Sequence, residues 1–385
     1  MYKYSQKKRI RSFMKTFGCV FITLIFGFLI ISLAIPDRSF SSSEKRQLTT
    51  IKDIDFDIYN NNLSSDFESY ASDQIAGRDI FIKLCTGFKR LLGNRESQGI
   101  YYCKDGYLIE KMDELDENTL YRTIDSVNSF TKENSIPSSL VIIPNAVSVC
   151  KDKLPAFSIT EDQDRVYKLL SERISDRISL YFPSDTLNKL YEDGKQVFYY
   201  SDHHWTSEAA YECLPDICKL LDITPKDFKP LLVCDSFTGS LASKSGFTSP
   251  KKDKIYIYKP VLEENYIVTY IDKKIKTASI YSQEGLASTD PYTVFLGGNA
   301  SHINIKTDKT DGKRLLVFKD SYFNSFLPFI VDEFSEIDII DPRYYYGDIK
   351  ELLLEKDYDE ILYFYNMNTF AGDTSLIQVI GGSYE

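Results

Sequence analysis

The 385-residue chain is 43% apolar and 26% charged, as in ordinary globular proteins, which excludes a disordered or collagen-like chain. Its net charge of −10 at pH 7 argues against a nucleic-acid-binding protein, so we expect no nucleic-acid partner. The charge is uneven, because residues 1–15 hold six basic residues and no acidic one, which leaves 40 basic against 56 acidic residues in the rest of the chain.

An apolar run near the N-terminus predicts a membrane anchor. Residues 16–35 form an uncharged stretch of 20 residues. At about 1.5 Å per residue it spans ~30 Å, the thickness of a bilayer core. The preceding basic segment, residues 1–15, predicts a cytoplasmic N-terminus and an extracytoplasmic remainder of the chain. A signal peptide cleaved after Ser32-Leu33-Ala34 and a buried core helix are the alternatives.

Beyond the anchor, residues 36–66 are polar and Ser-rich, which is typical of a juxtamembrane linker. From residue 67 to 385, strand-like runs alternate with amphipathic ones, which predicts an α/β domain with a parallel sheet covered by helices. The predicted strands are 139–144, 196–201, 314–319, 336–341 and 360–365. The predicted helices are 118–133, 162–176, 206–221, 322–334 and 346–358. Residues of about 225–310 break the rhythm with short alternating stretches, such as 254–259 and 266–271, and predict a β-rich insertion.

Two of the three histidines lie in Ser201-Asp202-His203-His204-Trp205-Thr206, between a predicted strand and a helix that Thr206 can cap. On an extended backbone Asp202 and His204 share a face while His203 points away. The Asp202 carboxylate can then accept the Nδ1–H of His204 and leave Nε2 free to take a proton. The alternatives are structural roles for these residues or, less favoured, a metal site.

A general base needs a nucleophile, and Ser321 is the best placed hydroxyl. It lies between the predicted strand 314–319 and a helix that starts at Tyr322, as in a nucleophile elbow, although the glycines of G-x-S-x-G are absent. The alternative is a serine that caps the helix. Gly297, Gly298 and Asn299 follow an apolar run and are candidate oxyanion donors, or else a plain turn. His302 just beyond them is interpreted as structural or as a ligand contact.

The Asp202-His203-His204-Trp205 tetrad resembles the signature of the DHHW proteins, relatives of the SGNH-like alginate O-acetyltransferases. The resemblance covers nearly the whole chain. Further blocks occur in the same order as in that family: residues 36–41, 73–79, 144–145, 237–241, 297–299 and 319–321. It implies an SGNH-hydrolase-like three-layer α/β/α fold with a triad of Ser321, His204 and Asp202.

The same resemblance implies a membrane-anchored enzyme that transfers an acyl group, typically acetyl, to a surface or exported polysaccharide. The acyl donor would come from a multi-spanning membrane acyltransferase, and no cofactor or metal is expected. Possible accessory residues are His203, Trp205, Arg78 and Arg343, with Tyr344, Tyr345 and Tyr346 as possible sugar contacts. An acylesterase with the same site and a non-catalytic scaffold for polysaccharide assembly remain alternatives.

Overall fold

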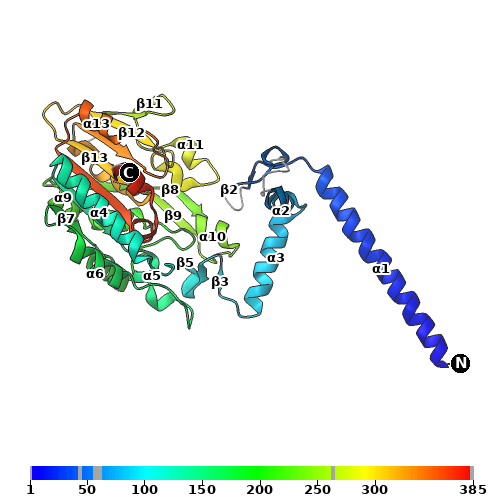
Figure 1. Cartoon of the computed structure of the whole chain (residues 1–385). Coiled ribbons are helices and arrows are strands. Elements are labelled where there is room, and N and C mark those ends of the chain that lie inside the picture. The colour runs from blue at the N-terminus through cyan, green and yellow to red at the C-terminus, as the bar shows by residue number, and fades with distance from the viewer. Residues whose placement is uncertain (1, 42–45, 55–62, 262–264, 382–385) are drawn as a thin grey trace. The chain divides into compact units, whose positions relative to one another are not determined.

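The computed structural model describes residues 2–41, 46–54, 63–261 and 265–381 (Figure 1). It divides into two compact units, residues 1–93 and 94–385. The division falls after residue 93, whereas the sequence pattern placed the start of the α/β domain at residue 67. Residues 67–93 therefore belong to the first unit.

In its described residues the first unit contains three α-helices and a pair of short strands. Helix α1 (Tyr2–Ala34) contains the stretch Phe13–Ala34, which is long and apolar enough to cross a bilayer, a property shared by single-pass anchors and signal sequences. Helices α2 (Leu63–Gln74) and α3 (Arg78–Leu91) follow. Between them Gly77 adopts a φ of +68°, in the left-handed region that glycine tolerates best.

The predicted juxtamembrane linker is partly ordered. Strands β1 (Phe40–Ser41) and β2 (Arg46–Gln47) pair with each other, and a 3₁₀ turn covers Ile51–Asp53. The Thr49 N–H donates to Asp73 Oδ2 at 2.9 Å, so this segment is bound to α2. Residues 42–45 and 55–62 of the predicted linker lie outside the described part of the chain.

The second unit is built on a mixed eight-stranded sheet. In spatial order its strands are β11 (Ile275–Thr277), β10 (Tyr266–Tyr270), β12 (His302–Thr307), β14 (Glu336–Ile340), β13 (Arg314–Lys319), β15 (Glu360–Asn366), β6 (Ser138–Ile143) and β7 (Ile178–Tyr181). The five strands from β14 to β7 are parallel, and the three at the other end are antiparallel.

The centre of the sheet is buried on both faces. Every residue of β6, β14 and β15 is buried, and so is every residue of β13 except the exposed Arg314. Continuous burial of this kind requires cover on both sides, as the run of apolar residues in these strands predicted. The helices of this unit are α4 (Glu117–Asn134), α5 (Ala146–Val149), α6 (Gln163–Arg173), α7 (Ser184–Glu192), α8 (Ser207–Glu212), α9 (Leu214–Leu220), α10 (Ser240–Ser245), α11 (Gln283–Leu286), α12 (Tyr322–Phe326), α13 (Ile349–Glu355), α14 (Met367–Gly372) and α15 (Ser375–Ile380).

The region predicted as a β-rich insertion contributes to the main sheet. Strands β8 (Phe228–Phe237) and β9 (Asp253–Pro260) form a separate hairpin, but β10, β11 and β12 extend the large sheet beyond β14. An uncovered edge at β14 would leave backbone N–H and C=O groups unpaired, and β12 pairs them. Residues 262–264 of this region lie outside the described part. A smaller sheet contains β3 (Glu96–Ser97), β4 (Ile100–Tyr102) and β5 (Leu108–Glu110).

The predicted strand 196–201 is wrong. Only an isolated bridge joins Phe198 to Trp205, so the segment is a loop. The side chain of Asp253 accepts the N–H groups of Tyr200 and Ser201 at 2.7 and 2.9 Å. Since a carboxylate satisfies these donors, the segment needs no neighbouring strand.

Three predicted helices are shorter than expected. The stretch 322–334 contains only α12 before two 3₁₀ turns, Leu327–Phe329 and Val331–Glu333, because Pro328 lacks the N–H that an α-helix needs. The stretch 206–221 is divided into α8 and α9 at Cys213. The stretch 346–358 contains only α13, which starts where the Asp348 carboxylate accepts the Lys350 N–H.

We expect the added strand β12 to be part of the cooperative core. Ile303 in β12 is fully buried, so Ile303→Ala should lower the free energy of unfolding by about 2–5 kcal/mol, measured by urea denaturation. The matched control is Ile267→Ala in the adjacent strand β10, where the side chain is 54% exposed and the cost should stay below about 1 kcal/mol. Equal losses for the two variants would contradict this assignment.

Candidate active site

Ser321 lies two residues beyond the last residue of β13, at the carboxyl end of a central parallel strand, where open α/β sheets bind ligands. It occupies the N-cap position of α12, but its hydroxyl makes no capping hydrogen bond. The Asp320 carboxylate accepts the Tyr322 N–H instead, at 2.8 Å. The Ser321 hydroxyl is therefore not used to cap the helix, which was the structural alternative for this residue.

The tetrad forms a tight loop closed by the Phe198–Trp205 bridge. The Tyr199 N–H donates to the His204 carbonyl at 3.2 Å, and Thr206 caps α8 by accepting the Ala209 N–H, as predicted. Trp205 is completely buried, and its indole N–H donates to the Tyr322 carbonyl at 3.1 Å. This bond ties the tetrad loop to the turn that carries Ser321.

The loop and the turn bring three side chains into one hydrogen-bonded chain. His204 Nε2 lies 2.7 Å from Ser321 Oγ, and His204 Nδ1 lies 2.6 Å from Asp202 Oδ1. All three residues are at least nine-tenths buried. Ser321 and His204 are 117 positions apart in the sequence, and the arrangement has the geometry of a nucleophile, a general base and an orienting carboxylate.

Both oxygens of the Asp202 carboxylate are satisfied by hydrogen bonds. Oδ1 also accepts the His204 N–H at 3.0 Å, and Oδ2 accepts both the backbone N–H and the hydroxyl of Ser240 at 2.8 Å. Burial alone would raise the pKa of Asp202, but the adjacent imidazoles and the hydrogen bonds from His204 and Ser240 hold it well below its usual value. The group is therefore an anion that keeps the Nδ1 proton on His204.

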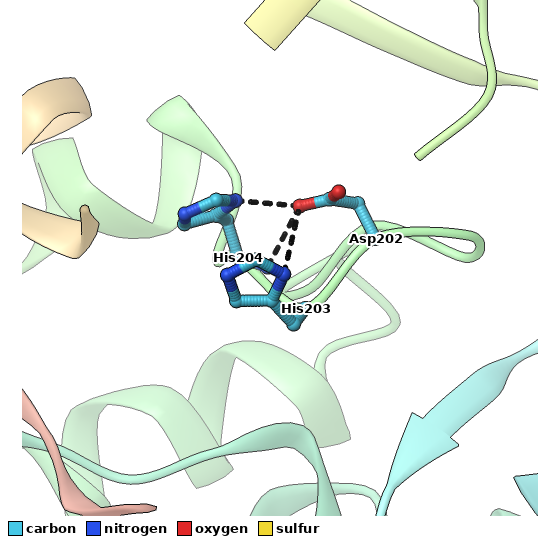
Figure 2. Close-up of side chains that lie close together, drawn as sticks. All are labelled: Asp202, His203 and His204. Atoms are coloured by element: carbon cyan, nitrogen blue, oxygen red, sulfur yellow. Dashed lines mark hydrogen bonds and ion pairs between the residues drawn. The ribbon is translucent and has the colours of Figure 1, made fainter. Parts of the chain in front are cut away.

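The expectation that His203 points away from His204 is wrong. The two rings lie side by side, with centroids 3.8 Å apart and planes inclined by 36°, and Figure 2 shows both imidazoles facing the Asp202 carboxylate. His203 Nδ1 also lies 2.7 Å from the Ser240 hydroxyl. Side chains alternate only on an extended strand, and these residues lie in a loop.

The His204 ring is enclosed by aromatic side chains. It stacks on Tyr292 with centroids 3.8 Å apart and planes inclined by 10°, and the Tyr292 hydroxyl donates to the Ser321 carbonyl at 3.2 Å. Burial lowers the pKa of His204 to about 4, and the neighbouring His203 adds to this effect against the opposing Asp202 carboxylate. The imidazole is therefore neutral at physiological pH and able to accept a proton.

The predicted oxyanion loop is held beside the strand of Ser321. Leu296, Gly297 and Gly298 all have positive φ angles, and the Gly298 N–H donates to the Phe295 carbonyl at 3.1 Å. This amide is engaged in the turn, contrary to its predicted role as a free donor. Asn299 Oδ1 accepts from Lys319 Nζ and from Asn324 Nδ2, both at 3.2 Å. Within the described residues, the Asn299 side-chain NH₂ and the Gly297 N–H have no acceptor, so both groups remain as donors in this loop.

Arg343 is held by a buried ion-pair network. Its Nε and Nη2 donate to the two oxygens of Asp341 at 2.8 and 2.7 Å, and the buried Lys319 Nζ contacts the same carboxylate at 3.1 Å. Arg343 also lines a cleft of about 610 Å³ together with residues of 110–119 and 368–373. Tyr344 contacts the Arg343 guanidinium with its ring, and Tyr346 is almost fully exposed. Arg343 thus combines a structural ion pair with a place in the wall of a cleft.

Two other predicted residues lie elsewhere. Arg78 belongs to the first unit, where it makes an ion pair with Asp73 at 3.5 Å and donates from Nε to the Ser72 carbonyl at 2.8 Å. His302 lies on β12 and contacts Asp338 at 2.8 Å, in a charged cluster with Lys356. Both contacts fit the structural reading of these residues.

Asp202, His203 and His204 also meet the geometric requirement for a metal site, since their potential ligand atoms lie within 4.8 Å of one another. Each of these side chains, however, already has a hydrogen-bond partner. His204 bonds to Asp202 and Ser321, and His203 Nδ1 contacts Ser240. A metal would have to break the chain that links the imidazole to the serine.

Sequence reasoning missed the supporting residues Ser240, Tyr292 and Lys319. The block 237–241 was noted for its order along the chain, but nothing in it indicated that Ser240 binds the tetrad carboxylate. Gly239, next to it, lies so close to Asp202 that an added Cβ would stand 2.6 Å from Asp202 Oδ2. The glycine is thus required by close approach of two backbones.

We expect Gly239→Ala to disturb the site because its methyl group would displace the Asp202 side chain. The free energy of unfolding should drop by roughly 1–3 kcal/mol, measured by urea denaturation. The matched control is Gly372→Ala, where an added Cβ has no neighbour within 4 Å. A Gly239→Ala protein with unchanged stability would refute this account.

Comparison with known proteins shows which family and which solved structures this chain resembles. The family model described as "DHHW protein" matches residues 130–340. No curated protein sequence matches the chain. Among solved structures, a DHHW family protein from Eubacterium siraeum DSM 15702 aligns with a TM-score of 0.63 and 18% identity, over 74% of this chain and 97% of that one.

Bacillus cereus PatB1, solved with a sulfonyl adduct, aligns with a TM-score of 0.59 and 16% identity, over 72% of this chain and 97% of that one. At these identities the likeness concerns the fold. The family model, in contrast, covers more than half of the sequence and includes the whole tetrad and Ser321. The chain therefore belongs to the DHHW family.

Proposed function

We propose that this protein is a serine-dependent acyltransferase that moves an acyl group, most simply acetyl, onto a hydroxyl of an exported or cell-surface polysaccharide. The observation that carries the proposal is the buried chain from Asp202 through His204 to Ser321, with contacts of 2.6 and 2.7 Å. Supporting it is the resemblance of the tetrad and its accompanying blocks to the relatives of the alginate O-acetyltransferases.

The first half of the reaction forms an acyl-enzyme. His204 Nε2 takes the Ser321 proton as Oγ attacks the carbonyl carbon of the donor, and a tetrahedral intermediate forms. When this intermediate collapses, the bond to the leaving group breaks, and the imidazolium returns its proton to the departing oxygen. Asp202 stabilises the imidazolium, and its bonds to Ser240 keep it oriented.

The second half runs the same steps with an acceptor. A sugar hydroxyl gives its proton to His204 and attacks the acyl-enzyme carbonyl. Collapse of the second intermediate breaks the bond between the acyl carbon and Ser321 Oγ, which takes the proton back from His204. With water as acceptor the same site would be an acylesterase. The acceptor therefore decides between the two activities, and exclusion of water from the site favours transfer.

The developing oxyanion requires donors close to Ser321. In the described part of the chain, no acceptor is bonded to the Ser321 backbone N–H, so this group is available. We assign the second donor to the Asn299 side-chain NH₂, because Lys319 and Asn324 hold the oxygen of that amide. Each such donor typically contributes about 3–4 kcal/mol to transition-state stabilisation.

The cleft beside Arg343 is the proposed route for the polysaccharide. At about 610 Å³ it is large enough for a short stretch of sugar rings. Arg343, in the wall of this cleft, is one of the charged groups that lower the pKa of His204. Tyr344, beside Arg343, offers an aromatic face of the kind that stacks on sugars.

The apolar helix at the N-terminus supports a place at the membrane. With the basic segment on the cytoplasmic side, a retained span would leave the second unit outside the cell, where polysaccharides are modified. A multi-spanning membrane acyltransferase would supply the acyl group from the cytoplasmic side. A non-catalytic scaffold would not need the three side chains aligned, and the complete chain of contacts favours the enzyme.

Replacement of the three residues tests the assignment directly. Ser321→Ala, His204→Ala and Asp202→Asn should each lower turnover of a chromogenic acetyl ester by roughly 10³-fold or more, because the side chains act as one unit. The matched control is Ser126→Ala, a similarly buried serine on α4, which should keep its activity.

A sulfonyl fluoride should label Ser321 in the wild-type protein and fail to label the Ser321→Ala protein, as mapped by mass spectrometry. PatB1 was solved with a sulfonyl adduct, which supports the choice of reagent. Turnover that survives in folded Ser321→Ala would refute the serine mechanism. Turnover that survives there but is abolished by chelators would favour a metal site at the tetrad.

The pH profile should follow His204. Protonated His204 cannot accept the serine proton, so kcat/KM should be lost as pH falls through about 4 and should stay level through neutral pH. Because His203 is one of the groups that lower the pKa of His204, His203→Gln should move this rise toward higher pH. A wild-type rise near the ordinary histidine value, ~6.5, would contradict the buried environment described above.

A further inference from the structure

Helix α3 in the first unit carries a continuous apolar stripe. Six large apolar side chains, in the helix or at its C-terminal end, recur at spacings of three, four and seven residues. They therefore lie on one face of the helix. Each is between 48% and 86% exposed: Ile80, Phe81, Leu84, Phe88, Leu91 and Leu92. A soluble helix does not leave a face of this size in water without a partner.

Basic residues border this stripe. Lys83 and Arg90 follow one edge at a spacing of seven residues, and Lys89 lies on the other edge. Asp79 is the only acidic residue of the helix, so α3 has a clear positive charge. Long basic side chains beside an apolar face can reach from the apolar layer into the headgroup layer of a bilayer.

The stripe begins next to the apolar span of α1. The rings of Phe28 and Phe81 meet edge to face with centroids 5.7 Å apart, and the Ala76 N–H donates to the Ser32 hydroxyl at 3.1 Å. Phe28 and Ser32 both lie inside Phe13–Ala34, and Phe81 lies in the stripe. If the span crosses a bilayer, the start of α3 is at the boundary of its hydrocarbon layer.

We infer that α3 lies in the bilayer interface, with the stripe in the acyl layer and the basic residues among anionic headgroups. The occupant of this face is the lipid of the leaflet at the C-terminal end of the span. The contact with Phe28 favours lipid over a protein groove, because it fixes the stripe at membrane depth. The inference rests on the proposed anchoring and is independent of acyl transfer.

The test places a fluorescent label on each side of α3 in the full-length protein. The exposed or partly exposed cysteines Cys19, Cys85 and Cys234 are first replaced by serine. Leu84→Cys then puts an environment-sensitive dye on the stripe, and Lys89→Cys, also exposed, puts it on the polar face as the matched control. Both proteins are reconstituted into nanodiscs of phosphatidylcholine and phosphatidylglycerol.

Brominated lipid should remove most of the emission of the dye at position 84 and little at position 89, whereas iodide in the buffer should do the reverse. If iodide quenches the two dyes equally and brominated lipid quenches neither, the inference is overturned. It is also overturned if the dye at position 84 is shielded from both quenchers, since protein would then cover this face. Neither readout depends on enzymatic activity, so these outcomes leave the proposed reaction unaffected.

Discussion

The buried carboxylate of Asp202 is the group on which the arrangement of the site depends. A charge out of contact with water is tolerated only when hydrogen bonds replace its hydration. His204 and Ser240 supply these bonds, one residue to each oxygen. Because this anion needs hydrogen bonds to both of its oxygens, the tetrad loop and the start of α10 lie close together. Gly239, which has no side chain, permits the close approach.

A second buried charge connects the site to its surroundings. Lys319 ends the strand that leads to Ser321, and its ammonium contacts both Asp341 and Asn299. Arg343 shares Asp341 and lines the cleft. The strand that leads to Ser321 and the cleft wall thus meet at the Asp341 carboxylate, and Lys319 links them to the loop of Asn299. A change in the charge of any of these groups therefore alters the electrostatic environment of the others.

The sequence pattern correctly predicted the central strands of the sheet, whose residues are almost all buried. The run 314–319 is β13, and the other central strands agree within a residue or two, because strands covered on both faces are apolar throughout. The prediction of a strand failed where a side chain distant in sequence binds the backbone N–H groups. Residues 196–201 have the composition of a strand, but Asp253 binds their N–H groups, and this aspartate lies more than fifty residues further along the chain.

The sequence by itself determined the chemical types available for a site, the apolar helix that precedes them and the strand-to-helix turn at Ser321. The tertiary structure alone decided that Ser321 meets His204, that Ser240 holds Asp202, that Tyr292 covers the imidazole and that His203 lies beside it. The physical reason is that residue spacing governs contacts within a helix or a strand. The contacts of this site join loops that are far apart in sequence. The need to hydrogen-bond the buried Asp202 carboxylate decides which of these loops meet.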